Sequence, residues 1–147
     1  MNGYHSFYKG HFSGGFGKKI HDFQIMMTGK AFFSKNLNVV NQFIVGGSWE
    51  LDQLDFLPGS HYGEFRIDQG ILGNLRIDYS LMPDIDIGFR SGILMTPQKN
   101  HIGYGLKMMT VFQGIVCHFG LGISSDSIQK GISKNLIISG GITFGFM

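Results

Sequence analysis

Histidines, serines and glycine-rich stretches are the residues of this sequence that could carry chemistry. The histidines lack the spacing of zinc ligands, and the single cysteine, Cys117, can build neither a thiolate cluster nor an internal disulfide. No serine lies in a Gly-x-Ser-x-Gly elbow, and residues 14–17 lack the Gly-Lys-Ser/Thr ending of a phosphate-binding loop. We therefore predict no enzyme activity, no metal and no cofactor. The six histidines are His5, His11, His21, His61, His101 and His118.

Charged residues between positions 64 and 90 form a second candidate group, because they share one parity. Asp78 and Asp86 flank a turn, with Arg76 and Arg90 nearby. Two carboxylates at this spacing could form an acid pair, but the nearby arginines favour cross-strand ion pairs inside a barrel. We predict that the whole group lines a wet interior: Glu64, Arg66, Asp68, Arg76, Asp78, Asp86 and Arg90.

Residues 48–62 have no steady periodicity and contain the only tryptophan, Trp49. We predict that this segment is the longest loop of the protein. Trp49 is a candidate for contact with a ligand or with a membrane, and an interfacial anchor is the plainer role for it.

The composition favours one closed β-domain over residues 1–147. The chain has 147 residues, 23 glycines and 14 phenylalanines, which suits strands that bend and aromatic residues at membrane interfaces. The net charge of +2 is small and the basic residues are scattered, which argues against a nucleic-acid partner. Because no apolar run reaches the length of a membrane helix, any membrane span must be made of strands.

The stretch from 64 to 81, EFRIDQGILGNLRIDYSL, shows the clearest periodicity. Seven of its nine odd-numbered residues are apolar, against one of its nine even-numbered residues. A period of two held over this length predicts one long β-strand with an apolar side facing lipid and a polar side facing an interior. The predicted lipid side of the protein comprises Phe65, Ile67, Leu75, Ile77, Tyr79, Ile85, Ile87, Phe89, Phe119, Leu121, Phe144 and Phe146.

Similar alternation elsewhere predicts about eight antiparallel strands. They cover residues 4–16, 21–33, 39–45, 64–81, 85–95, 104–112, 115–123 and 136–147, with a connection at 17–20. Short turns at 82–84 and 113–114 alternate with longer loops at 46–62, 96–101 and 124–134. Outer-membrane barrels sort their connections in this way. The fold class predicted is therefore all-β, an antiparallel transmembrane β-barrel that is either a small barrel or half of a larger one.

The last residues, SGGITFGFM, resemble the terminal signal that outer-membrane proteins present to the barrel assembly machinery. The residues that match its spacing are Ser139, Gly141, Phe144 and Phe146. The expected location is the bacterial outer membrane, with the lipid bilayer and the assembly machinery as partners. The first residues, MNGYHSFYKG, do not form a secretory signal, so this location requires that a signal was removed or that the chain belongs to a longer protein.

From residue 41 to 147 the chain resembles the C-terminal barrel of the Omp85 superfamily, especially the barrels of bacterial patatin-like and surface-antigen proteins. The matching pieces are NQFIVGG at 41–47, FLPGSHYGEF at 56–65, GYGL at 103–106 and GITFGF at 141–146. The resemblance implies that the glycine pair leads into a large loop that folds inward. It also implies that the eight strands are the last eight of sixteen, completed by other polypeptide segments, and that the barrel works in protein insertion or secretion.

The chain departs from this family in the loop at 48–62, which contains no arginine and so lacks the family's Val-Arg-Gly-Phe/Tyr motif. No periplasmic POTRA repeats and no patatin domain are present in the sequence. Two alternatives therefore stay open. One is a small closed barrel of structural or adhesive role that acts through its loops, and the other is a soluble β-sandwich that binds a glycan or a partner protein.

Overall fold

The structure is a computed structural model that describes residues 8–35, 37–46, 55–61, 64–113, 115–125 and 136–144. These residues form nine strands and one short 3₁₀ helix, η1 (Val39–Asn41). The strands are β1 (Tyr8–Ile20), β2 (Phe23–Lys35), β3 (Phe43–Val45), β4 (Phe65–Ile67), β5 (Gly70–Met82), β6 (Ile85–Met95), β7 (Asn100–Phe112), β8 (Ile115–Ser124) and β9 (Ile137–Phe144). Among the described residues no helix is long and apolar enough to cross a membrane.

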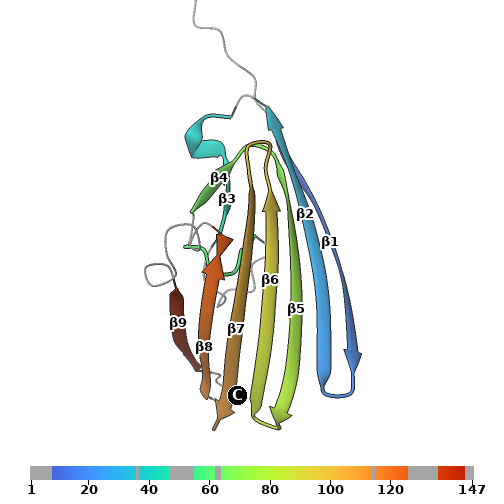
Figure 1. Ribbon diagram of the computed structural model, residues 1–147, viewed down its shortest axis with the longest axis vertical. Coiled ribbons are helices and arrows are strands. Elements are labelled where there is room, and N and C mark those ends of the chain that lie inside the picture. Colours follow the sequence, from blue (N-terminus) through green and yellow to red (C-terminus); the bar gives the residue numbers. More distant parts are fainter. Residues whose placement is uncertain are drawn as a thin grey trace, which may run out of the picture.

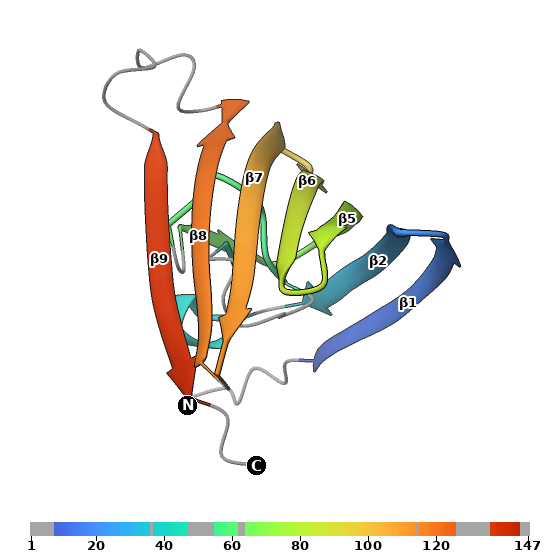
Figure 2. The ribbon, with the colours of Figure 1, turned by 90° about the horizontal axis from the view of Figure 1, so that it is seen from below.

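Seven strands form one antiparallel sheet in the order β1-β2-β5-β6-β7-β8-β9 (Figure 1). Every neighbouring pair is antiparallel, which confirms the prediction of an antiparallel all-β fold. The sheet curves strongly and is open, with β1 and β9 at its two edges (Figure 2). The described residues therefore form an open, curved sheet and not the closed barrel that was predicted, and we call this large sheet the wall.

Connections of different length are sorted to the two ends of the sheet (Figure 1). Tight turns at residues 21–22, 83–84 and 113–114 join β1 to β2, β5 to β6 and β7 to β8 at one end. His21 adopts a left-handed backbone at φ 54°, so the predicted connection at 17–20 is wrong, and β1 continues to Ile20 before the chain reverses. At the other end, residues 96–99 join β6 to β7, and the chain leaves the sheet after β2 and after β8.

The predicted single strand at 64–81 is wrong, because the chain bends at Asp68 and Gln69 and separates β4 from β5. The bend is held by Ser34 of β2, whose Oγ donates to the Asp68 carbonyl at 2.7 Å and whose carbonyl accepts from Gln69 Nε2 at 3.0 Å. Gly70 follows, where an added Cβ would lie 2.7 Å from the Met95 carbonyl oxygen.

The strand predicted at 39–45 is also not part of the wall. Residues 39–41 form η1, and β3 pairs only with β4, in a small two-stranded sheet. This small sheet lies inside the curve of the large one (Figure 2). We call residues 37–46, 55–61 and 64–69 the insert, since they leave the wall after β2 and return to it at β5.

The hydrophobic core lies between the insert and the concave face of the large sheet. It is made of buried side chains from both sides, and Phe65 packs against it. The predicted lipid-facing positions of Phe65 and Ile67 are therefore wrong, because Ile67 is only 7% exposed and both residues face this core. The sheet contributes Phe32, Leu72 and Leu94, and the insert contributes Phe43, Val45, Leu57 and Ile67.

Candidate functional site

The two faces of the large sheet differ in chemistry, because directly paired residues point to the same side. One row on the convex face runs through Ile25, Ile77, Phe89, Leu106, Leu121 and Ile138. From β5 to β9 the residues of this parity include no charged side chain. Many of them are large, apolar and exposed, because no described residue covers them. The large exposed ones in these strands are Ile71, Leu81, Ile87, Met95, Tyr104, Leu106, Met108, Phe112, Phe119, Ile138 and Ile142.

From β5 to β9 the charged residues of the wall lie on the concave face, whereas Lys18 of β1 and Lys35 of β2 have the convex parity. Asp78 is at the centre of an ion-pair cluster: its Oδ1 lies 2.6 Å from Arg90 Nη1, and its Oδ2 accepts a hydrogen bond from Arg76 Nε. Arg90 is 5% exposed and also donates to the Phe89 carbonyl at 3.0 Å. A buried guanidinium requires such partners, because removing a charge from water without compensation is costly.

Gly88 gives this cluster its space. It lies directly opposite Asp78 in the β5–β6 pair. A Cβ added at Gly88 would lie 2.4 Å from Asp78 Oδ1 and 2.7 Å from Arg90 Nη1. A side chain at this position would therefore displace one member of the ion pair.

A cavity of about 200 Å³ adjoins the cluster near the tight turns. Arg76, Asp78, Asp86 and Arg90 line it, together with Lys19 and Lys107. Four of the seven charged residues that the sequence analysis singled out therefore lie on this part of the concave face. The paired strands bring them together, because residues 76, 78, 86 and 90 share one parity across the β5–β6 hairpin.

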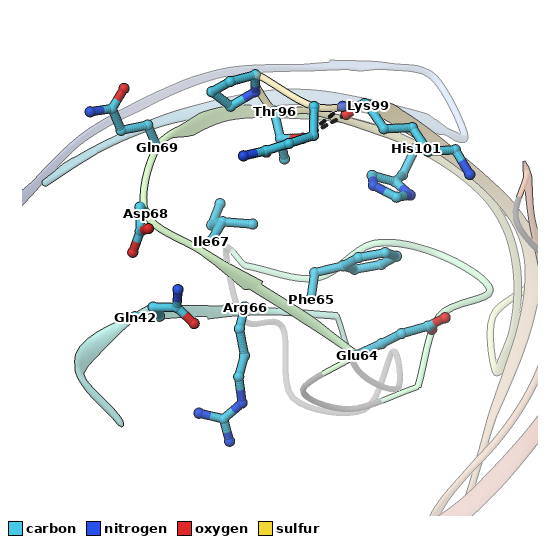
Figure 3. Close-up of a pocket in the computed structure, with 12 residues that line it drawn as sticks. Gln42, Glu64, Phe65, Arg66, Ile67, Asp68, Gln69, Thr96, Lys99 and His101 are labelled. Atoms are coloured by element: carbon cyan, nitrogen blue, oxygen red, sulfur yellow. Dashed lines mark hydrogen bonds between the residues drawn. The ribbon is translucent and has the colours of Figure 1, made fainter. Parts of the chain in front are cut away.

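The other three charged candidates lie on the insert and not on the wall. Glu64, Arg66 and Asp68 line a second cavity of about 540 Å³, bounded by Gln42 and by residues 96–101. Figure 3 shows Phe65 and Ile67 on one side of β4 and Arg66 on the other. In the cavity wall the rings of Phe65 and His101 pack at a tilt of 48°, with their centroids 4.4 Å apart. Thr96 Oγ1 donates to the Lys99 carbonyl at 2.8 Å in the turn beside them.

The insert reaches the wall through a closely packed segment, residues 57–60. Leu57 is fully buried, and Ser60 Oγ donates to its carbonyl at 2.6 Å. Here the backbone of the insert packs directly on the backbone of the wall, since a Cβ added at Gly103 would lie 1.9 Å from the Pro58 carbonyl oxygen. Gly59 adopts φ 72°, and a Cβ there would lie 2.2 Å from the Ile123 carbonyl carbon. Glycines on both surfaces therefore allow backbone to pack on backbone.

An ion pair adds a polar contact between the insert and the wall. Lys30 of β2 donates to Asp55 Oδ2 at 2.8 Å and lies 2.6 Å from Oδ1. Sequence analysis missed this pair, because its members are 25 positions apart and no local pattern connects them. The sequence indicated only that Lys30 lies on the polar side of its strand, and not which residue it contacts.

The remaining candidates are placed only in part. Ser139 and Gly141 lie in β9, opposite Gly120 and His118, on the concave side. Phe144 ends β9, and Phe146 and Trp49 lie outside the described residues. Among the described residues no group of three or more histidine, cysteine or acidic side chains could hold a metal ion.

Comparisons with protein-family models, with curated proteins and with solved structures find no match to this chain.

The Asp78 cluster gives a first prediction. Asp78→Asn should lower the free energy of unfolding by about 2 kcal/mol, because the buried Arg90 loses its anionic partner while the side-chain shape is kept. Denaturant unfolding of the protein measures this loss. Asp86→Asn is the matched control, since Asp86 shares the face but forms no ion pair within the described residues. Equal losses in the two variants would show that the ion pair contributes nothing.

Proposed function

We propose that this chain forms part of the wall of a β-barrel in the bacterial outer membrane. The observation that carries the proposal is the convex face, which is mostly apolar and carries no charged residue from β5 to β9, while the charged residues of these strands lie on the concave face. Soluble proteins seldom leave so wide an apolar surface uncovered, whereas the outer side of a membrane barrel requires one. This contrast also argues against a soluble β-sandwich.

Strand length and the sorting of connections support the same proposal. Strands β5 to β8 have 10 to 13 residues, which is enough to cross a bilayer when tilted. Three tight turns lie at one end of the sheet, and the strands joined by longer stretches of sequence end at the other, as in barrels with short periplasmic turns and long outer loops. The concave face would then surround a partly aqueous interior occupied by the insert.

Within this class we propose an Omp85-like role in protein insertion or secretion. The support is the part of the insert after Gly46, residues 55–61 and 64–69, which packs against the concave face, as the resemblance implies. Two features differ from the expectation. The wall has seven strands instead of eight, and the ionic contact between loop and wall has its cation on the wall, at Lys30, and its anion on the insert, at Asp55.

Spin labels on two adjacent residues of β7 test the membrane assignment. In a Cys117→Ser background, a nitroxide at Leu106→Cys should be accessible to oxygen from the lipid phase, and one at Lys107→Cys to a water-soluble nickel chelate. Leu106 is 55% exposed on the convex face, and Lys107 lines the interior cavity. Power-saturation spectra of the protein in membranes give both accessibilities. If the nickel chelate reaches both labels equally, the membrane proposal is wrong.

The transport role needs a separate measurement. Lipid vesicles that contain the protein should accelerate the folding of an unfolded eight-stranded test barrel several-fold over empty vesicles. The heat-modifiable gel shift of the test barrel reports its folding. A rate equal to that in empty vesicles would contradict the Omp85-like role and leave the membrane assignment untouched.

A further inference from the structure

The two edges of the large sheet carry backbone groups available for pairing. β1 pairs with β2 over all thirteen of its residues without a bulge, and its other edge faces no described strand. At the opposite side, β9 pairs only with β8. Both edge strands continue the apolar convex face, where Phe12 and Ile142 are 75% and 63% exposed. Unpaired backbone groups are not tolerated in the hydrocarbon of a membrane, so both edges require partners there.

The direction of the strands limits what those partners can be. Six successive antiparallel pairings separate β1 from β9, so the two edge strands run in the same direction. Direct closure of β1 on β9 would therefore make a parallel seam. A second copy of the chain, oriented the same way in the membrane, would pair its β1 with this β9 and would also make parallel seams.

The contents of the interior limit the partner further. Eight strands enclose a space that side chains alone fill. Here the concave side already holds β3, β4 and residues 57–60, with Leu57 and Val45 fully buried among them. One added strand, which would bring seven to eight, leaves no room for this backbone.

We propose that a run of further antiparallel strands, odd in number and at least three, joins β1 to β9 and completes the barrel, and that its sequence is not a second copy of this one. An odd number makes both seams antiparallel and gives the even total that bacterial barrels have. This inference rests on the proposed function, because the shared orientation of two copies is imposed by the membrane.

Disulfide cross-linking in the membranes of the producing cells tests the closure. In a Cys117→Ser background, cysteines replace Phe12 or Phe16 in β1 together with Ile138 or Ile142 in β9. Because paired strands bring Cβ atoms to about 5 Å, adjacent edges would oxidise to a disulfide. We expect none. An intrachain disulfide would show self-closure, and a covalent dimer would show a second copy, and either result would overturn the proposal.

A control pair and a mass measurement complete the test. Leu75→Cys with Ser91→Cys, directly opposite each other in β5 and β6, should cross-link and show that oxidation works. Native mass spectrometry of the assembly extracted from those membranes should give a mass that is not a whole-number multiple of 16.3 kDa. A whole-number multiple would overturn the proposal. The spin-label experiment on β7 does not depend on closure, so failure of the membrane assignment is seen separately.

Discussion

Gly103→Ala is expected to displace the insert from its contact with the wall and to lower the free energy of unfolding by about 3 kcal/mol or more. The added Cβ would lie 1.9 Å from the Pro58 carbonyl oxygen and 2.9 Å from the carbonyl carbon, so backbone has to move. Gly92, paired with Gly103, offers no space either, because a Cβ there would meet Pro58 Cδ at 2.8 Å. Once Pro58 moves, neighbouring Leu57 loses its buried place.

Denaturant unfolding in detergent and the reactivity of a cysteine placed at Leu57 measure the two parts of this prediction. Gly29→Ala is the matched control, since Gly29 also lies within a strand of the wall but a Cβ there meets nothing within 4 Å. That variant should keep or slightly raise the stability, because alanine restricts the unfolded chain. Gly59→Ala adds a Cβ to the insert side of the same contact and should cause a similar loss of stability. A Gly103→Ala protein with unchanged stability and a protected cysteine would show that the insert does not pack against this wall.

Met108→Lys and Met109→Lys should differ sharply although the two residues are neighbours in β7. Met108 is 47% exposed on the convex face, whereas Met109 lines the interior cavity, opposite Asp86. A lysine on the lipid side costs about 2–4 kcal/mol near the bilayer midplane. A lysine at 109 meets water and a nearby carboxylate, and its cost should stay below about 1 kcal/mol.

Reversible unfolding from lipid vesicles measures both variants, and the same pair in detergent gives a useful comparison. Because a lysine can reach water more easily in a micelle, the difference between the variants should shrink there. Losses of equal size in vesicles would mean that the convex face is not in lipid. A larger loss for Met109→Lys would mean that the concave face is the dry one.

The charged candidates show what the alternation of residues along a strand can predict, namely which side chains share a face. Arg76, Asp78, Asp86 and Arg90 come together because side chains alternate along each strand and a tight hairpin keeps the register. Ile67 shows where parity fails. It continues the apolar set of β5 in sequence, but it faces the core of the insert. Alternation indicates that one side of a strand is apolar and says nothing about what covers that side.

The sequence by itself determined the antiparallel β-architecture, the turns after β5 and after β7, and the two faces of β5 to β8, because these depend on residues that are neighbours along the chain or across a hairpin. It misplaced the turn between β1 and β2. Only the tertiary structure decided that the insert leaves the wall, that Leu57 and Pro58 lie on the glycines of β6 and β7, and that Lys30 forms an ion pair with Asp55. Those contacts join segments far apart in sequence. They depend on close packing of backbone against backbone, which leaves no periodic pattern in the residues.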